Sequence, residues 1–446
     1  MANRQPLPAP AADQRYIRRA FKKPQIRLRN VFGPGLITGA SDDDPSGIAT
    51  YSQAGAQFAY GLGWTMIFTY PLMSAVQMIS ARIGRTTGHG IAGNLRRHYP
   101  AWLTISLVTL LLIANTINIG ANLGAMADAT ALVSGLRPGA FLVIYAAFCA
   151  LSEVFMRYGN YVRVLKWLTV ALLAYVITLF LVDIPWSRAL GGLVVPTVTL
   201  DSAALTMIVA IFGTTISPYL FFWQASQEAE DVREFDERKP LIRAPKDGPS
   251  ELRRIELDTL IGMAASNLVA LAIILTAAAT LNANGITDIT TSAEAAAALA
   301  PVAGPYASTV FALGIVGTGL LAIPVLAGSA AYALGEALRW PVGLDCKPRR
   351  AKAFYGTIVA ATAVGALINF TPINPIKALV WAAVINGVVA VPVMTVMMLM
   401  ASRKSIMGKF SVTGTLRALG WVATGAMAAA VAAMLWGMIA YAPPVL

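Results

Sequence analysis

Long apolar runs separated by shorter polar segments dominate the hydrophobic pattern of this chain. Most of the runs are long enough to cross about 30 Å of hydrocarbon as a helix. The pattern therefore predicts an all-α polytopic membrane protein with about 11 transmembrane helices. The predicted spans lie near residues 31–57, 62–81, 101–134, 139–156, 164–184, 202–224, 257–282, 305–335, 354–370, 376–400 and 415–441.

Composition and charge placement support a membrane protein and orient it. Mean hydropathy is +0.64 and only 13% of residues are charged, which is far too apolar for a soluble domain. The formal net charge of +12 does not indicate nucleic-acid binding, because the basic residues gather in alternate loops and in the tail formed by residues 1–29. By the positive-inside rule, this placement predicts a multi-pass protein of the cell membrane with a cytoplasmic amino terminus.

Two of the predicted spans are interrupted by proline-centred polar segments. The first reads Ser41-Asp42-Asp43-Asp44-Pro45-Ser46-Gly47 and the second Gly213-Thr214-Thr215-Ile216-Ser217-Pro218-Tyr219. Proline removes a backbone donor and disrupts the preceding turn, so nearby carbonyl groups lose their helical partners and can face a cation. An ionisable side chain inside a span is costly and usually functional. The segment around Asp44 therefore predicts an ion or substrate site, and transport is the leading hypothesis.

The spacing of the two interruptions predicts an internal repeat. They fall in the first and sixth spans, so the second follows five spans after the first. An odd offset reverses orientation in the membrane, as in transporters built from two inverted five-helix repeats. We expect a first repeat over residues 30–200, a second over 201–400, and a final loop and span over 401–446.

Several stretches resemble the natural resistance-associated macrophage protein (Nramp) family of divalent metal transporters. The likeness is carried by Gly33-Pro34-Gly35 through Asp44-Pro45 to Gly55-Ala56-Gln57-Phe58, by Ser80-Ala81-Arg82 and the loop after it, by Asp258 and Asn267, and by Phe311-Ala312-Leu313-Gly314. The resemblance implies a LeuT-like inverted five-helix repeat with broken helices 1 and 6. It also implies transport of manganese or ferrous ions, commonly together with protons.

The chain departs from the family pattern at the metal site itself. The family's Asp-Pro-Gly-Asn reads Asp44-Pro45-Ser46-Gly47, and its Met-Pro-His-Asn reads Ser217-Pro218-Tyr219-Leu220. Losing the thioether leaves oxygen ligands, which suit magnesium, calcium or manganese better than softer metals. Magnesium is usually held by one or two carboxylates plus waters. The changes place the chain in a divergent Nramp-related branch and predict Mg²⁺ or Mn²⁺ as the transported ion.

The residues that carry protons in the family are also replaced. The histidine of the sixth-helix motif is Tyr219, and the acidic pair of the third helix falls in Asn115-Thr116-Ile117-Asn118-Ile119-Gly120-Ala121-Asn122. An asparagine side chain does not relay protons by titrating. The only histidines, His89 and His98, lie in a predicted loop. We therefore expect weak or absent coupling to protons.

The predicted metal site draws on both interruptions and on the tenth span. Asp44 is the expected carboxylate ligand. Its neighbours Asp42 and Asp43 are expected to attract cations at an aqueous entrance, with direct contact of one of them with the ion as the alternative. Backbone carbonyls exposed by the breaks are plausible ligands, although serine and threonine can instead bond back to their own helix. The full candidate set is Asp44, Ser41, Gly47, Thr214, Ser217 and Asn386.

Other functional classes remain open at this point. No phosphate-binding glycine loop or paired-histidine zinc motif indicates an enzyme or an ATP-driven pump. The expected partners are the transported divalent cation, bound transiently, and the lipid bilayer; no cofactor, nucleic acid or oligomer is implied. A transporter of the same architecture for an amino acid or other small organic solute is the alternative, since short side chains at the breaks leave room for one. A sensor or scaffold that lost transport is the third hypothesis.

Overall fold

The computed structural model of the protein describes residues 34–155, 171–196, 201–234, 238–344 and 346–440. The predicted basic tail and residues 164–170 of the predicted fifth span lie outside this part of the chain. The helices, in chain order, are α2 (Pro34–Asp42), α3 (Pro45–Phe58), α4 (Trp64–Thr87), α5 (Ile91–His98), α6 (Ala101–Ser134), α7 (Pro138–Phe155), α9 (Leu173–Thr178), α10 (Trp186–Val194), α11 (Ser202–Thr215), α12 (Pro218–Glu234), α13 (Gly248–Thr280), α14 (Ser292–Ala297), α15 (Ala300–Ala303), α16 (Ala307–Leu338), α17 (Lys352–Ile368), α18 (Pro375–Ser402), α19 (Lys404–Met407) and α20 (Gly414–Ala440).

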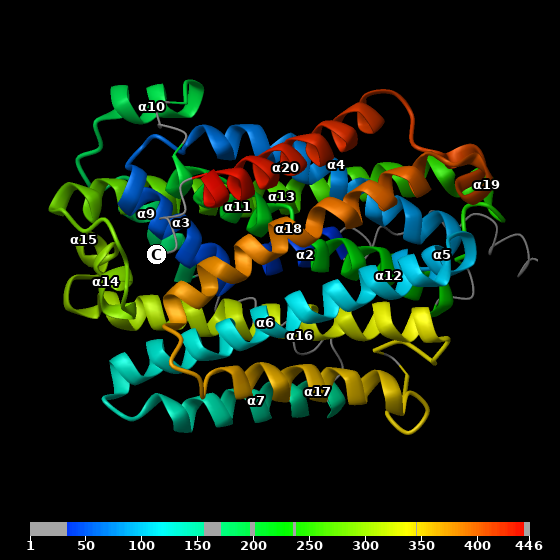
Figure 1. The fold of residues 1–446 in the computed structure, drawn as a ribbon, viewed down its shortest axis with the longest axis horizontal. Coiled ribbons are helices and arrows are strands. Elements are labelled where there is room, and N and C mark those ends of the chain that lie inside the picture. The colour runs from blue at the N-terminus through cyan, green and yellow to red at the C-terminus, as the bar shows by residue number, and fades with distance from the viewer. Residues whose placement is uncertain (1–33, 156–170, 197–200, 235–237, 345, 441–446) are drawn as a thin grey trace, which may run out of the picture.

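The long helices run roughly along the longest axis of the molecule, and short helices gather at its two ends. Figure 1 shows α10, α14 and α15 at one end and α5 and α19 at the other. The α5 end is rich in arginine, and we call it the basic face. Its arginines include Arg96 and Arg97 on α5 and Arg339 at the end of α16.

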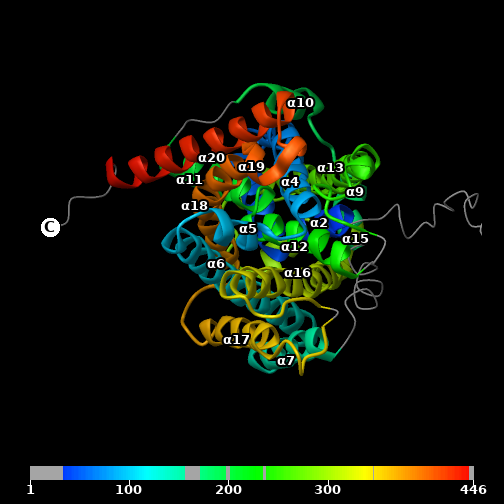
Figure 2. The ribbon, with the colours of Figure 1, turned by 90° about the vertical axis from the view of Figure 1, so that its right-hand side faces the viewer.

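The two broken helices occupy the middle of the bundle. The half-helices α2 and α3 pack against α13, and α11 packs against α18, while α12 lies between α4 and α16. Figure 2 shows α7 and α17 together at one edge and α20 toward the opposite edge. The broken helices are thus surrounded by protein on the sides that would otherwise face lipid, which is where non-helical backbone is tolerated in a membrane.

Both predicted interruptions are confirmed, whereas two helix boundaries were predicted wrongly. Seven helices of the described part are long and apolar enough to span a membrane, and α17 is a shorter apolar helix of 17 residues. Helix α4 continues to Thr87, so Arg82 and Arg85 lie on a helix and not in a loop. Helix α13 likewise begins at Gly248 and includes Arg254. Apolar periodicity ends where the charges begin, but the backbone helix continues because those charges find partners inside the protein.

Close backbone contact holds the first broken helix against α13. A Cβ atom added to Gly55 on α3 would lie 2.2 Å from the carbonyl oxygen of Ile274 and 2.9 Å from the Cβ of Ala277. Small residues permit this approach, as they commonly do between membrane helices. The position of α3, and with it the break at Asp44, therefore depends on a glycine at residue 55.

We expect Gly55→Ala to destabilise the protein. The added methyl group has no space, and overpacking of this kind typically costs about 1–3 kcal/mol. Thermal unfolding of the purified protein in a non-ionic detergent, followed by tryptophan fluorescence, should show a lower midpoint. Gly425→Ala on α20 is the matched control, because nothing lies within 4 Å of its added Cβ. Equal midpoints for the two variants would contradict this account of the contact between α3 and α13.

Candidate metal site

The first break lies between α2 and α3, and the side chain of Asp44 organises it. Helix α2 ends at Asp42 and α3 begins at Pro45, whose missing N–H is tolerated in a first turn. Asp44 is the N-cap of α3 with an extended backbone. Its Oδ1 accepts hydrogen bonds from the backbone N–H of Gly47 at 2.9 Å and from the hydroxyl of Ser46 at 2.6 Å. One oxygen of the carboxylate thus satisfies the amino-terminal end of α3.

The second break lies between α11 and α12, and the carbonyl groups that it exposes are bonded by a side chain of the break itself. Helix α11 ends at Thr215 and α12 begins at Pro218. The hydroxyl of Ser217 donates to the carbonyl oxygens of Gly213 at 2.7 Å and Thr214 at 2.8 Å. Back-bonding of this kind covers carbonyls that the break exposes. The oxygen of Ser217 retains lone pairs, but its proton is committed to its own backbone.

The two breaks meet in the centre of the bundle. A Cβ atom on Gly47 would lie 3.2 Å from the Oγ1 of Thr214, so the start of α3 faces the end of α11. The hydroxyl of Tyr219 on α12 donates to the carbonyl oxygen of Ser41 at 3.1 Å. The tyrosine at the position of the family's histidine therefore links the two broken helices directly, a role that the sequence analysis did not predict.

Two asparagines on α6 complete the surroundings of Asp44. The side-chain amide nitrogens of Asn118 and Asn122 lie 3.4 Å and 3.3 Å from its Oδ2. Neither residue belongs to the predicted metal site. Their spacing of four residues places them on one face of a helix, and this spacing could have identified them as a pair from the sequence. The positions at which the resemblance implies acidic residues thus carry neutral amides aimed at the carboxylate.

The other two acidic residues of the first break face α13. The hydroxyl of Ser266 lies 2.6 Å from Oδ2 of Asp42 and 3.0 Å from Oδ1 of Asp43. Both residues are buried: the exposed fraction is 0% for Asp42 and 6% for Asp43. The expected entrance role would require contact with water, whereas in this structure the two residues lie inside the protein beside Asp44.

All six predicted site residues are buried, and several polar atoms near the breaks have no partner among the described residues. Asn386 on α18 is fully buried with both amide atoms unpartnered, and it adjoins Gly387, whose backbone packs against Gly213 of α11. Buried polar groups are normally satisfied, so these oxygens are available to an ion or to water at the breaks. The unpartnered oxygens comprise Ser41 Oγ, Asp42 Oδ1, Asn118 Oδ1, Asn122 Oδ1 and Asn386 Oδ1.

The chemistry of the site is a carboxylate among neutral oxygens. Within the described ranges, no three His, Cys, Asp or Glu side chains are grouped so as to hold a metal ion. The Oδ2 of Asp44 faces the side-chain amides of Asn118 and Asn122. Rotating either amide by 180° would exchange its nitrogen for its oxygen without changing the shape of the side chain, so the oxygen could face a cation bound at Asp44. Such a set of hard oxygen donors suits a hard divalent cation, with water supplying the remaining ligands.

Comparison with known proteins identifies the family. Residues 35–437 match the family described as natural resistance-associated macrophage protein-like. The chain belongs to the Nramp family. The resemblance seen in the sequence is thereby confirmed. Members of this family transport divalent metal ions and are not enzymes.

Relatives and solved structures agree with this assignment to the Nramp family. The divalent metal cation transporter MntH of Klebsiella pneumoniae strain 342 is 27% identical over 416 residues, covering 91% of this chain and 92% of that protein. A crystal structure of the manganese transporter of Eremococcus coleocola aligns with a TM-score of 0.69 at 16% identity, covering 95% and 90% of the two chains. Mhp1, a nucleobase-cation-symport-1 family transporter, aligns with a TM-score of 0.54 at 14% identity over 92% and 94%. The predicted LeuT-like inverted five-helix repeat with broken helices 1 and 6 is confirmed.

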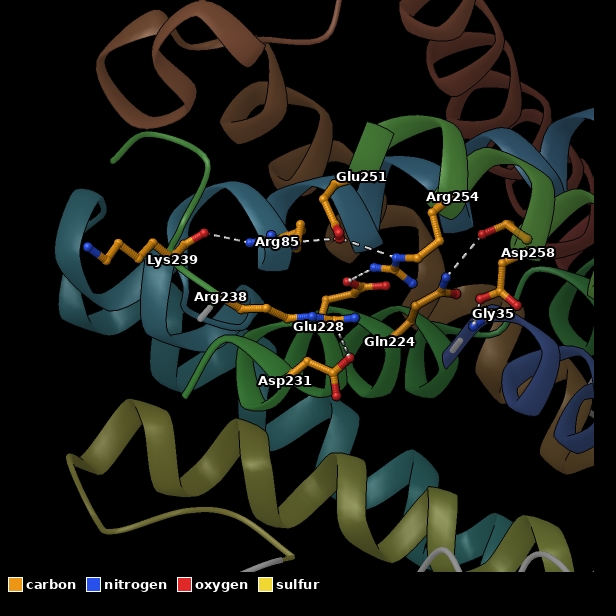
Figure 3. Close-up of polar contacts among 11 residues, drawn as sticks. Gly35, Arg85, Gln224, Glu228, Asp231, Arg238, Lys239, Glu251, Arg254 and Asp258 are labelled. Atoms are coloured by element: carbon orange, nitrogen blue, oxygen red, sulfur yellow. Dashed lines mark hydrogen bonds and ion pairs between the residues drawn. The ribbon is translucent and has the colours of Figure 1, made fainter. Parts of the chain in front are cut away.

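A network of ion pairs joins α4, α12 and α13 (Figure 3). Figure 3 shows Glu228 of α12 directed at Arg254 of α13, and the two atoms of this ion pair are 2.6 Å apart. Arg254 also contacts Glu251, which pairs with the buried Arg85 of α4 at 3.0 Å. A separate bond holds α2 against α13, since the backbone N–H of Gly35 donates to Oδ2 of Asp258 at 2.8 Å.

We expect Arg254→Ala to be strongly destabilising. The carboxylate of Glu228 is 1% exposed and would be left buried without its cation. Removing one partner of a buried pair typically costs about 3–5 kcal/mol. Lys377→Ala is the control, because the pair of Lys377 and Asp288 is 53% and 63% exposed and contributes little. Thermal unfolding in detergent compares the midpoints of the two variants. A decrease in the midpoint of Lys377→Ala as large as that of Arg254→Ala would contradict a stabilising role of the buried network.

Proposed function

We propose that this protein transports Mg²⁺ or Mn²⁺ across the cell membrane through an oxygen-lined site at Asp44, with weak or absent coupling to protons. The observation that carries the proposal is the set of buried oxygens at the two helix breaks. One carboxylate oxygen of Asp44 caps α3, and the other is directed at the amides of Asn118 and Asn122. A carboxylate held in this way is already positioned to bind a cation.

Buried charge favours a divalent ion. Asp42, Asp43 and Asp44 are consecutive and all buried. Carboxylates enclosed together repel one another and lose hydration, so a cation at the break lowers the free energy of the whole group. The ion is the natural compensation for this cluster, and release of the ion would restore the unfavourable interaction.

The donor set favours a hard cation over ferrous iron. No sulfur atom stands at the position of the family's methionine, where this chain has Ser217. Oxygen ligands suit magnesium and manganese, and magnesium keeps part of its water shell when bound by few carboxylates. The relatives are named divalent metal cation and manganese transporters. Manganese is therefore the ion supported by the relatives, and magnesium is the ion supported by the ligands.

Weak proton coupling is supported by the residues that surround the ion. Asn118 and Asn122 do not titrate, and Tyr219 is committed to the carbonyl of Ser41. His89, one of the two histidines of the chain, lies between α4 and α5. Burial and the positive charges of Arg97 and Arg233 lower its pKa to about 4, so it is neutral near pH 7. A proton moving with the metal would need a different carrier.

The orientation follows from charge. The basic face carries arginines of α5, α12 and α16, and positive residues accumulate on the cytoplasmic side of membrane proteins. We therefore place the basic face and the amino terminus in the cytoplasm. The organic-solute alternative receives no comparable support, since the relative aligned over 91% of this chain is named a divalent metal cation transporter.

Sealed liposomes containing the purified protein and a pH-sensitive dye provide the direct test. We expect saturable uptake of Mg²⁺ and Mn²⁺ without internal acidification. Asp44→Ala should reduce uptake to the level of empty liposomes, because it removes the carboxylate ligand and the cap of α3. Asp288→Ala removes an equally negative side chain from the surface and should leave uptake unchanged.

Three outcomes would contradict the proposal. Acidification matching metal uptake one for one would show that protons are coupled despite the neutral amides. Absence of divalent uptake in the unmutated protein would exclude metal transport and return attention to organic solutes or to a scaffold without transport. Uptake retained by Asp44→Ala would exclude Asp44 as the essential ligand.

Ser217→Met tests the ligand-hardness argument separately. It restores a thioether and frees the carbonyls of Gly213 and Thr214 from the serine hydroxyl. A softer donor should raise the preference for Mn²⁺ over Mg²⁺ by roughly tenfold. Competition between the two ions in the same liposome assay measures this ratio. The control is Ser217→Ala, which frees the same carbonyls without adding sulfur, and an equal ratio in both variants would count against a ligand at residue 217.

A further inference from the structure

A cavity of about 560 Å³ opens on the basic face, away from the metal site. It lies where α5, α12 and α16 pack together, at one end of the bundle in Figure 1. Nothing in the proposed transport of a cation requires this cavity. Its lining consists of His89, Gly93, Arg96, Arg97, Arg233, Glu336, Arg339, Trp340 and Val342.

The cavity carries a strong excess of positive charge. Four arginines line it, and Glu336 is its one carboxylate. Burial lowers the pKa of His89 to about 4, and the charges of Arg97 and Arg233 contribute to this shift. None of the four arginines takes part in an ion pair among the described residues, although Arg96 donates to the carbonyl oxygen of Ala337 at 2.8 Å. The positive field is therefore largely uncompensated by the protein.

The carboxylate in the cavity is already engaged by backbone. Glu336 accepts hydrogen bonds from the N–H groups of Gly90 at 3.1 Å and Gly93 at 2.8 Å, at the start of α5. A Cβ atom on Gly90 would lie 2.5 Å from that carboxylate, so glycine is required for the contact. Glu336 thus fixes α5 against α16, and it holds the arginines of α5 at the cavity.

We propose that this cavity is a binding site for a phosphate-ester anion, held by the guanidinium groups of Arg96, Arg97, Arg233 and Arg339. Planar guanidinium groups bind phosphate oxygens through paired hydrogen bonds, and several of them match a doubly charged group. The volume exceeds what a phosphate group alone fills, and Trp340 and Val342 give the organic part an apolar wall. Both an anionic phospholipid headgroup and a soluble phosphate ester have this chemistry.

The site would couple the anion to a helix that forms part of the metal site. Arg233 lies in the last turn of α12, whose first residue is Pro218 at the second break. An anion shared by Arg233, Arg97 of α5 and Arg339 of α16 ties the far end of α12 to two neighbouring helices. The inference concerns anion binding alone, so its test is independent of the transport proposal.

The experiment uses the full-length protein and compares two sources of the anion. Glycerol 1-phosphate is titrated calorimetrically into protein in a non-ionic detergent at low ionic strength. In parallel, native mass spectrometry counts phosphatidic acid retained from nanodiscs that contain it in phosphatidylcholine. The test variant is Arg97→Gln with Arg339→Gln. The matched control is Arg349→Gln with Arg350→Gln, which removes equal charge from the loop after α16, outside the cavity lining.

We expect the cavity variant to weaken binding at least tenfold and the control pair to leave it within twofold. Binding of glycerol 1-phosphate indicates a soluble ester, and retention of phosphatidic acid alone indicates a lipid headgroup. Absence of both, or equal losses in the two variants, overturns the proposal. If the double variant does not fold, the single Arg97→Gln and Arg339→Gln variants, each with an unchanged unfolding midpoint, are compared with Arg350→Gln in the same way.

Discussion

The break in the first transmembrane helix at Asp44 and Pro45 is the constraint on which the rest of the structure depends. A membrane offers no water to the backbone groups released by such a break, so other elements must satisfy them. Asp44 caps α3 with its own side chain, and Tyr219 donates to the carbonyl of Ser41. The helices around the break, α6, α11, α12 and α13, are therefore held close by the same polar groups that form the candidate metal site.

The side chains that surround Asp44 on α6 are neutral amides. In the family pattern the third helix brings acidic residues near the metal site, whereas here Asn118 and Asn122 direct neutral amides at Asp44. An amide offers either a donor or an oxygen to its neighbour without changing its charge. In the proposed uncoupled transport, rotation of these amides would let the site adjust to an empty or an occupied carboxylate without exchanging a proton with solvent.

The sequence allowed the spans and both breaks to be inferred, because proline acts locally on the helix that contains it. The capping of α3 by Asp44 was not predicted, since Asp44 was considered only as an ion ligand. The contacts of Asn118, Asn122 and Tyr219 were missed, since they depend on which faces of distant helices pack together. Helix α6 is apolar over much of its length, so its inward face is marked by little besides those asparagines. Arg85 fell outside the predicted span 62–81, because its buried partners, Glu251 and the carbonyl of Lys239, come from a segment more than 150 positions later.

The polar contacts around the half-helices also define what any opening of the site must break. Helix α2 is held by the bond from Gly35 to Asp258, and α12 by the pair of Glu228 and Arg254. Both contacts are made to α13, and Tyr219 joins α12 to α2. Moving one half-helix alone would leave buried groups unsatisfied, at a cost of about 1–3 kcal/mol for each neutral group and more for each charge. The bond from Tyr219 to Ser41 favours movement of α2 and α12 as one unit, and any displacement of that unit from α13 would have to break both the Gly35–Asp258 bond and the Glu228–Arg254 pair.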